Sequence, residues 1–584
     1  MRKTTASLVL IIFVLGFYYP VIFAGVNSLD DFRMLDELPR SGSMDILSLF
    51  NPFHARGYFR PLIILSYYID NSLLGLSPQA MHLENILIHL FNTLLVFGVG
   101  LTVYRDQAKR IELAFVSACV FSLHPLNVEA VAWISGRTDP LATMFALLAL
   151  VATYRFVIST RLPWLWVSAL LCLVGALAKE TALFCLPAAF LLACANDAAL
   201  RSAFKERCQK VVVSRVFWMV LPFILTGSTY LFFRVAMLRF VANKVIVKGA
   251  GVAAGHSITS ALRLLREVLV TYGFYVKKLF FPLPLNFAIT EINGSYLLLG
   301  LAVVVLIVYC MVRRLDSIAV QMMSAALLVM ASAFVISRAS IAWTPYAERY
   351  LYLPTVFFAF GIVDTGYRFC VRYVTPRTGV VVTFAVLSLM ATVTAKRAMV
   401  WQNNLSLYQD TIRKSPNFGC ISNELAIALS DDNRPEEAMA QIERGKKATN
   451  QGDMVLLSVN QASILGGQKR YKEAYQALAL TYKGKSISSA HIEVIKSYIN
   501  LMERERIFTK DRHRSRKLLS KLADLHELYY KRSGDTDHLY RAAQLELAAG
   551  ERERAHTMFS EVAQRAPEES IYKKFALKMA KKTE

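Results

Sequence analysis

The chain is poor in charged residues. Only 19% of its 584 residues are Asp, Glu, Lys or Arg, against roughly 25% in soluble globular proteins, and 55% are hydrophobic. This composition excludes an intrinsically disordered chain and argues against a single soluble domain. Acidic residues are the scarcer sign, so the formal net charge is +23. In a chain with many apolar runs, this excess predicts basic loops beside an anionic membrane leaflet and does not indicate nucleic-acid binding.

Cysteine is also scarce. The eight cysteines fall mostly inside apolar runs, and the sequence has neither a CxxC pair nor a Cys/His spacing typical of a metal site. Residues 396–584 contain only Cys420, which excludes a disulfide within that part of the chain. We therefore expect neither a metal ion nor another cofactor.

Long apolar runs, in contrast, recur up to residue 395. Eleven of them are predicted to span a membrane, at roughly 6–26, 82–103, 112–132, 139–157, 163–178, 181–195, 215–236, 297–312, 318–337, 351–367 and 378–395. The first run follows a basic N-terminus and lacks a clean A-x-A cleavage site, so we interpret it as a retained helix rather than a signal peptide. The sequence thus predicts an all-α protein, with a polytopic membrane domain at 1–395 and a soluble domain at 396–584.

The distribution of basic residues predicts the topology. With the N-terminus in the cytoplasm, alternation places six basic segments inside, at 1–5, 104–111, 155–162, 196–215, 313–316 and 368–377. The first external loop is then 27–81, and the soluble domain lies outside the cytoplasm. A second long external loop, 237–296, is also basic, and its apolar part is interrupted by charged residues. We expect an interfacial amphipathic helix there. The alternative, a further span, would reverse the side of every later segment.

Residues 396–584 carry an internal repeat. In three segments a small residue is followed twelve positions later by an alanine, at Ala426/Ala438, Ala462/Ala474 and Ala543/Ala555. Phe559 and Pro567 follow the last pair at the offsets of the 34-residue tetratricopeptide pattern, in which small residues let two antiparallel helices pack closely. We predict three or four such repeats, with a degenerate unit at 488–530. The alternative is a generic helical bundle. Arrays of this kind normally bind a peptide or a partner.

An acidic pair, Asp30 and Asp31, follows the first span at the external face. Two adjacent carboxylates at the mouth of a membrane domain can supply a general base for a hydroxyl group, with the second carboxylate orienting the first. The alternative is an ordinary polar flank or a helix cap.

A polar stripe lies within the second span. His82, Asn85, His89 and Asn92 follow one another at helical spacing and therefore share one face. Buried stripes of this kind usually bond neighbouring helices. We favour that interpretation over metal binding, because no carboxylate cluster accompanies the histidines at ligand spacing.

Basic residues also gather at the predicted external ends of the spans. Arginine suits phosphate because its planar fork can bind two oxygens. The candidates for phosphate binding are Arg60, Arg137, Lys179 and Arg349, and Glu348 stands beside the last of them. The alternatives are a snorkelling Arg60 and the ion pairs Arg137–Asp139 and Lys179–Glu180. Acidic, basic and aromatic groups on one external surface suit an enzyme with a lipid-linked phosphate donor and a hydroxyl acceptor. They suit a transporter less well, since no span shows Gly/Pro breaks in matched halves.

These segments together resemble the transmembrane and tetratricopeptide-repeat O-mannosyltransferases and their bacterial relatives, within the GT-C glycosyltransferase superfamily. The resemblance rests on the acidic pair after the first span, on FRPL, HLENILIHLFN, FSLHPLNVEAVAWISGRTD, ALAKETAL and AERYLYLP, and on the repeat tail, all in the order of the family. It implies a membrane enzyme that takes a sugar from a polyprenyl- or dolichyl-phosphate carrier. The enzyme would transfer that sugar, with inversion, to a hydroxyl group on the non-cytoplasmic side.

The resemblance also implies roles for single residues. Asp30 is expected as the catalytic base and Asp31 as its partner, with the exchange of these two roles left open. We expect the phosphate contacts to be Arg60, Arg137, Lys179 and Arg349, and His54 and Glu348 to contact or orient the acceptor. The repeats would hold a protein acceptor, and membrane lipids would surround the spans. The modest length favours a bacterial inner membrane with the site and the repeats facing the periplasm, and the endoplasmic reticulum membrane if the source is eukaryotic.

Three rival functions stay open at this point. The same chemistry could serve a lipopolysaccharide, a wall polymer or a lipid acceptor, because the tail is shorter than in the large animal members. A non-enzymatic scaffold that presents repeats would not need Asp30 and Asp31. A transporter or flippase would move its substrate without forming a glycosidic bond.

Overall fold

The computed structural model describes residues 1–36, 46–51, 59–206, 208–244, 258–338, 344–448, 454–482, 486–509, 511–567 and 570–583. Over these ranges the regular elements are helices, apart from one isolated antiparallel bridge between Ile289 and Tyr346. The all-α prediction is therefore confirmed. The chain divides into two compact units, Met1–Thr411 and Ile412–Glu584. We call them the membrane unit and the repeat unit.

The boundary between the units falls later than the one predicted at residue 395. α17 (Pro376–Val400) extends beyond the predicted span, and α18 (Asn404–Lys414) begins within the membrane unit. Tyr408 on α18 donates its hydroxyl hydrogen to the Asn27 side chain at 3.3 Å. This contact joins the start of α18 to the segment that follows the first span.

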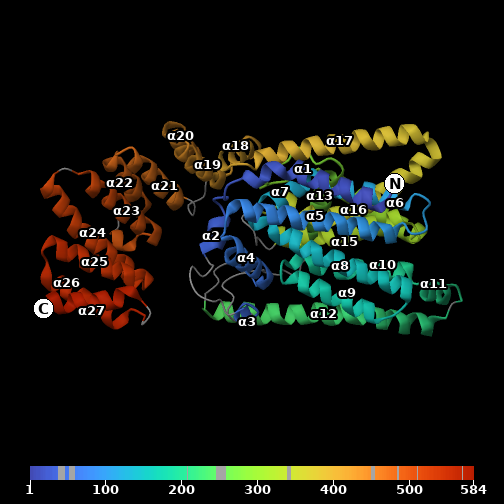
Figure 1. Ribbon diagram of the computed structural model, residues 1–584, viewed down its shortest axis with the longest axis horizontal. Helices are drawn as coiled ribbons and strands as arrows, with labels where there is room; N and C mark the ends of the chain where they lie inside the picture. The colour runs from blue at the N-terminus through green and yellow to red at the C-terminus, as the bar shows by residue number, and fades with distance from the viewer. Residues whose placement is uncertain are drawn as a thin grey trace. The chain divides into compact units, whose positions relative to one another are not determined.

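The helices of the membrane unit run side by side along the horizontal of Figure 1. They are α1 (Lys3–Tyr18), α5 (Pro78–Val103), α6 (Arg110–Ser122), α8 (Thr138–Ser159), α9 (Pro163–Ala176), α10 (Cys185–Asn196), α12 (Gln209–Lys244), α14 (Tyr296–Arg314), α15 (Ile318–Arg338), α16 (Tyr352–Tyr373) and α17. Shorter elements join them: η1 (Tyr19–Phe23), α2 (Asp31–Asp36), α3 (Ile46–Leu49), α4 (Pro61–Leu74), η3 (Pro125–Asn127), α7 (Val128–Ala132), η4 (Ser135–Arg137), η5 (Glu180–Phe184), α11 (Ala198–Lys205), α13 (Ile258–Phe280) and η6 (Glu348–Leu351).

Each of the eleven predicted spans corresponds to helix, but not all of these helices are long and apolar enough to cross a membrane. Among the described residues seven meet that requirement, or eight if the bent pair of α6 with η3 and α7 counts as one span. α9 (Pro163–Ala176) and the continuous apolar helix of η5 and α10 (Glu180–Asn196) are shorter than the 18 residues that this count requires. The second half of α16 carries Asp364, Arg368 and Arg372. The chain is an integral membrane protein, and its span count is lower than eleven by this measure.

The bend after α6 directs the chain into the candidate site. The two halves of the pair meet at 48°. Pro125 has no backbone N–H to continue the helix, and the His124 ring accepts a hydrogen bond from the Leu126 N–H at 3.4 Å. The Asn127 side chain donates to the Phe121 carbonyl at 2.7 Å, which satisfies a carbonyl that the break leaves open. The residues from 129 to 137 are therefore turned to one end of the bundle.

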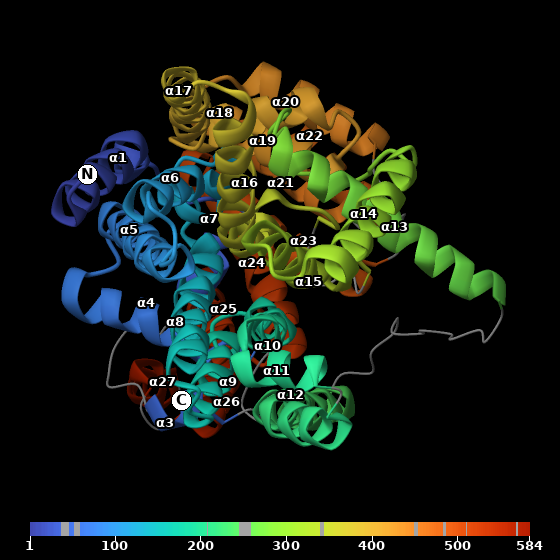
Figure 2. The ribbon, with the colours of Figure 1, turned by 90° about the vertical axis from the view of Figure 1, so that its right-hand side faces the viewer.

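α13 lies in the segment predicted as an interfacial helix. Figure 2 looks along the bundle helices and shows α13 lengthwise, so this helix runs across the bundle. Its C-terminal half is packed into a core with α15 and α16, through Phe274, Tyr275 and Leu279. α13 and α14 cross at a pair of glycines. A Cβ on Gly273 would come within 2.0 Å of the Tyr296 carbonyl oxygen, so only glycine permits this approach.

The polar stripe of α5 bonds neighbouring helices, as the sequence predicts. Asn85 donates to the Trp133 carbonyl at 2.9 Å, and Asn92 donates to the Pro140 carbonyl at 2.8 Å. One ring nitrogen of His89 lies 2.6 Å from the Tyr352 hydroxyl. These bonds satisfy buried polar groups inside a largely apolar bundle.

The repeat unit consists of helix pairs. They are α19 (Gly419–Asp431) with α20 (Pro435–Ala448), α21 (Met454–Gly467) with α22 (Tyr471–Ala479), α23 (Ile492–Phe508) with α24 (Arg512–Ser533), and α25 (Thr536–Ala549) with α26 (Arg552–Arg565); α27 (Ile571–Thr583) follows, and η7 (Leu480–Tyr482) and η8 (Ile487–Ser489) lie between. All six alanines of the predicted pattern are fully buried. The third pair occupies the predicted degenerate unit. The repeat prediction is thus confirmed at the level of helix pairs and small-residue contacts.

Candidate active site

The two aspartates after the first span lie in different environments. Asp31, the first residue of α2, is 1% exposed, whereas Asp30 is half-buried. One carboxylate oxygen of Asp31 accepts the Asn27 N–H at 2.9 Å, and the other accepts the Ser135 N–H at 2.9 Å and the Ser135 hydroxyl. Burial raises the pKa of Asp31 to about 6, against the effect of these hydrogen bonds, and the charge of Asp30 adds to the increase.

A small polar cavity of about 10 Å³ opens beside Asp31. It is about large enough for one water molecule or one hydroxyl group. Its walls come from four segments of the membrane unit, and the lining residues are Gly25, Asn27, Asp31, His82, Ala132, Trp133, Trp401, Asn403, Asn404 and Leu407. The indole N–H groups of Trp133 and Trp401 are buried and have no hydrogen-bond partner among the described residues. The cavity is therefore lined by one carboxylate and by two tryptophans whose N–H groups are unused among the described residues.

Arg60 is positioned by the start of α4. Pro61 occupies the first helical position, and Gly75, with φ of 68°, ends the helix. The Arg60 guanidinium donates to one carboxylate oxygen of Glu180 from Nη2 at 2.8 Å and from Nε at 3.3 Å. Arg234, near the end of α12, lies 3.7 Å from the other oxygen of Glu180. Two arginines thus share one carboxylate.

Arg137 is enclosed by acidic and polar groups. The side chain is fully buried. Its Nη1 lies 2.7 Å from Asp70 and 2.9 Å from Glu84, and its Nε donates to Asn85 at 2.8 Å. The guanidinium also covers the ring of Tyr67, 4.7 Å from the ring centroid. This arrangement occupies Arg137 within the protein, so the geometry favours a structural role over the expected phosphate contact.

Lys179 pairs with Asp139 and not with its sequence neighbour. Its ammonium nitrogen lies 2.7 and 2.6 Å from the two carboxylate oxygens of Asp139. Burial and the charges of Arg349 and Arg60 lower the pKa of Lys179, and Asp139 opposes this effect. The alternative ion pairs Arg137–Asp139 and Lys179–Glu180 are therefore wrong, because each of these groups takes a partner from another part of the chain.

Arg349 binds Glu129, a residue that the sequence did not single out. The Glu129 carboxylate accepts the Arg349 guanidinium and, with its other oxygen, the Glu348 N–H at 3.1 Å and the Arg349 N–H at 3.3 Å. The guanidinium lies 4.9 Å from the ring centroid of Trp133 and 5.1 Å from that of Tyr350. Glu129 lies within the segment HPLNVEAVAW, which the sequence analysis used. Its role could not be predicted from the sequence, because its partner is 220 residues away.

Glu348 is held by basic groups from two other segments. One of its carboxylate oxygens accepts the Lys278 ammonium at 2.8 Å and the Asn286 N–H at 2.8 Å. Arg397 on α17 lies 3.9 Å from the other oxygen and 2.8 Å from Asp410. The role expected for Glu348 at the acceptor stays a prediction. His54, the other residue expected there, lies outside the described residues.

Four basic side chains, which we call the cation row, form two pairs that meet in sequence at Lys179 and Glu180: Arg234 with Arg60, and Lys179 with Arg349. The first two share Glu180. Lys179 and Arg349 both lie against the ring of Tyr350, at 5.5 and 5.1 Å from its centroid. Arg349 reaches Trp133, which lines the Asp31 cavity. Three of the four predicted basic residues are therefore brought together, and Arg137 is not part of the row.

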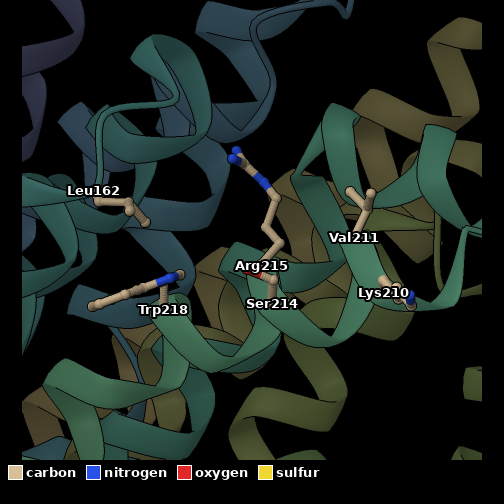
Figure 3. A pocket seen from close by; sticks show the side chains of 6 residues that line it. All are labelled: Leu162, Lys210, Val211, Ser214, Arg215 and Trp218. Carbon is tan, nitrogen blue, oxygen red and sulfur yellow. The ribbon is translucent and has the colours of Figure 1, made fainter.

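A larger cavity, of about 400 Å³, lies elsewhere in the membrane unit. Figure 3 shows its six lining side chains, with Arg215 and Trp218 projecting from α12 near Leu162. These residues stand at the start of α9 and in the first part of α12, whereas Lys179 follows the end of α9 and Arg234 lies near the end of α12. The cavity is thus separate from the cation row. Within the described ranges, no three His, Cys, Asp or Glu side chains gather as metal ligands would.

No family model matches this chain. Comparison with known proteins nevertheless identifies relatives. The mouse protein O-mannosyl-transferase TMTC1 is 39% identical over 98 residues, 17% of this chain and 10% of that protein. The fruit-fly Tmtc1 is 30% identical over 157 residues, 27% and 17% of the two chains. The nematode protein O-mannosyl-transferase F38B6.6 is 23% identical over 399 residues, 65% of this chain and 52% of that protein.

The curated homologues are therefore protein O-mannosyl-transferases of the TMTC family, as the sequence resemblance predicts. The chain spans about half or less of the length of these relatives. Among solved structures, yeast Tom70 aligns with 84% of this chain and 95% of its own at 11% identity and a TM-score of 0.18. That score is too low to carry an argument.

Proposed function

We propose that this chain is a membrane glycosyltransferase of the GT-C type that moves mannose or another hexose from a polyprenyl- or dolichyl-phosphate carrier to Ser or Thr hydroxyls of proteins. The named activity of the relatives supports protein O-mannosyl transfer as the general reaction. The observation that carries the proposal for this chain is the buried Asp31 carboxylate, which lines a hydroxyl-sized cavity at one end of the cation row.

Asp31 is the proposed base. The acceptor hydroxyl attacks the anomeric carbon of the sugar, its proton passes to a carboxylate oxygen of Asp31, and the bond between that carbon and the carrier phosphate breaks with inversion. A pKa of about 6 leaves Asp31 ionised at neutral pH and makes it a stronger base than an exposed aspartate. Asp30 stands beside it and adds negative charge. The resemblance favoured Asp30, and the contacts of Asp31 favour the exchanged roles.

The departing phosphate needs positive charge, and the cation row would supply it electrostatically. Arg60, Lys179 and Arg349 are the proposed contacts among the residues expected from the sequence. Each is paired with a carboxylate at present, so phosphate would compete with these partners. Because the carrier phosphate is already a leaving group, the proposed chemistry needs no metal.

The repeat unit supports a protein as the acceptor, since tetratricopeptide arrays normally bind peptides or partners. The basic residues of the predicted internal segments support a site and repeats on the non-cytoplasmic side. In a bacterium this is the periplasmic face of the inner membrane, and in a eukaryote it is the lumen of the endoplasmic reticulum.

The test is a comparison of exported glycopeptides from cells that carry the native protein or Asp31→Asn at equal expression. We expect hexose on Ser or Thr peptides to disappear with Asp31→Asn, because loss of a general base costs about 10²- to 10⁴-fold in rate. Asp106→Asn, at an exposed loop carboxylate, is the control and should leave the glycopeptides unchanged. An unchanged profile in the Asp31 variant contradicts the proposal. Loss of hexose from lipid or polysaccharide instead of peptides would show another acceptor.

A further inference from the structure

We propose that the cavity at the start of α12 binds the headgroup of an anionic phospholipid, with Lys210 and Arg215 as the contacts to its phosphate. The site is separate from the proposed active site, so the inference does not rest on sugar transfer. Three features carry it: the lining of the cavity, basic groups with unused donors, and the position of the cavity at one end of a spanning helix.

The lining combines basic, hydroxyl and apolar side chains. With a volume of about 400 Å³, the cavity is within the roughly 300–1,000 Å³ of typical small-molecule sites. Lys210, Ser214 and Trp218 follow one another at four-residue spacing on α12, so they share one face of the helix. Figure 3 shows Arg215 in the centre of the group, with Leu162 and Trp218 on one side of it. The cavity therefore offers two cations and a hydroxyl group beside an apolar wall.

Both cations have donors to spare. Lys210 is exposed, and its ammonium group has no ion-pair or hydrogen-bond partner among the residues that the structure describes. Arg215 is 24% exposed and donates from Nε to Asp197 at 2.7 Å. Its two terminal nitrogens have no hydrogen-bond partner within the described ranges. These nitrogens can donate to two phosphate oxygens at once, while the ammonium group of Lys210 supplies a second positive charge.

Asp197 fixes Arg215 without closing its outer edge. One carboxylate oxygen of Asp197 accepts the Ala199 N–H at 2.9 Å and the Leu200 N–H at 3.3 Å, at the start of α11. The other oxygen accepts Nε of Arg215. The carboxylate is fully buried, and both of its oxygens are engaged. It therefore orients the guanidinium and leaves the terminal nitrogens to an anion from outside.

The cavity lies at one end of a helix that can cross the membrane. Residues Gln209–Val235 of α12 are long and apolar enough to span. Trp218 is exposed and follows Lys210 by eight residues, about 12 Å at about 1.5 Å per residue. Tryptophan is enriched at this depth, between headgroups and hydrocarbon. Ile224 and Leu225 continue the exposed apolar surface beyond it. The order of polar and apolar groups along α12 thus matches that of a phospholipid, from headgroup to acyl chain.

The opposite wall has the same order. Leu162 directly precedes α9, and Trp166 and Leu170 on that helix are exposed. Acyl chains could lie along the apolar surfaces of α9 and α12 while the headgroup occupies the cavity between the starts of these helices. A free phosphate ester has no group to place on these surfaces. We therefore assign the cavity to a lipid headgroup.

The charge around the cavity selects an anionic lipid. The two segments beside it, 155–162 and 196–215, are basic and are both predicted on the cytoplasmic side. Arg161, next to Leu162 in the wall, is exposed. Basic segments at a membrane surface attract anionic lipids. A zwitterionic lipid would place its own cation beside Lys210 and Arg215, so it should bind more weakly.

The experiment measures lipid binding to the purified full-length chain in detergent by native mass spectrometry. The chain is titrated with dioleoyl phosphatidylglycerol or with dioleoyl phosphatidylcholine. We expect the anionic lipid to bind about tenfold more tightly, and Lys210→Gln to remove about this factor, the usual scale for one charge-assisted contact. Because Lys210 has no partner in the described part of the chain, this variant should keep the native melting temperature in detergent without lipid.

Two further variants separate the cavity from general attraction of basic residues. Ser214→Trp fills the cavity and keeps every charge, so it should weaken binding of phosphatidylglycerol. Arg313→Gln removes an exposed basic residue at the end of another spanning helix, α14, and should leave binding unchanged. Equal affinity for the two lipids, equal losses in Lys210→Gln and Arg313→Gln, or unchanged binding in Ser214→Trp would each overturn the proposal. Displacement of the lipid by glycerol 1-phosphate at equal concentration would overturn the assignment to a lipid.

Discussion

Two arginine clusters in the membrane unit differ in how far their guanidinium groups are exposed. Arg137 is fully buried and faces two carboxylates, Asp70 at 2.7 Å and Glu84 at 2.9 Å. Arg60 and Arg234 are about one-fifth exposed, and both lie within 4 Å of the Glu180 carboxylate. The first cluster is closed to solvent, and the second is open to it. Exposure, not residue type, distinguishes the two arginine environments.

Arg137→Gln should have the largest effect on stability. It leaves Asp70 and Glu84 without their buried cation, and removing one partner of a buried pair costs about 3–5 kcal/mol. The measurement is the free energy of unfolding in mixed detergent micelles, by denaturant titration. Arg215→Gln, at a partly exposed pair, serves as the control. A loss no greater than that of the control would remove the distinction between the closed and open clusters.

The pH dependence of the reaction tests the proposed role of Asp31 as the base. Its pKa is raised from 3.8 to about 6, and the base works only when it is ionised. We therefore expect kcat/KM to fall about tenfold per pH unit below about pH 6. Stability should change in the opposite direction. A raised carboxyl pKa favours the folded state when the group is protonated, so this contribution is present below about pH 4 and is lost as pH rises through about 6.

Rates and unfolding would be measured over the same pH range, with Asp31→Asn as the comparison. In that variant the stability change assigned to Asp31 should be absent. An acid limb of kcat/KM that stays near pH 4 would contradict the assignment of Asp31 as the base.

Arg60→Gln should have the smallest effect on stability. Partly exposed ion pairs contribute about 0–1 kcal/mol, so the free energy of unfolding should change by less than about 1 kcal/mol. The KM for the lipid-linked donor should nevertheless rise about tenfold, because one charge-assisted contact to phosphate is lost. A large stability loss with an unchanged donor KM would make Arg60 a second structural arginine.

The sequence predicted those features that depend on local pattern. Apolar runs marked the helices of the membrane unit, and the twelve-residue spacing of Ala426/Ala438 and its two copies marked helix pairs that pack through buried alanines. The stripe from His82 to Asn92 was correctly expected to bond neighbouring helices. These features follow from periodicity, because a helix places residues three and four apart on one face.

Long-range pairing could not be predicted in the same way. Lys179 pairs with Asp139 across 40 residues and Arg349 with Glu129 across 220, whereas the sequence alone suggested pairs of near neighbours. Arg234 was missed because it lies at the end of a predicted span, where an arginine often marks only the interface. The predicted count of eleven spans stays a prediction, because α9 and α10 are apolar but shorter than the other spanning helices.

The most direct measurement is sugar transfer by the purified full-length chain from a polyprenyl-phosphate hexose to a Ser/Thr peptide, followed by mass spectrometry of the peptide. The native protein and Asp106→Asn should add one hexose to a hydroxyl side chain, with the anomeric configuration opposite to that of the donor. Asp31→Asn should reduce the rate about 10²- to 10⁴-fold. No hexose on the peptide with the native protein, or an unchanged rate in Asp31→Asn, would contradict transfer to protein by an Asp31 base.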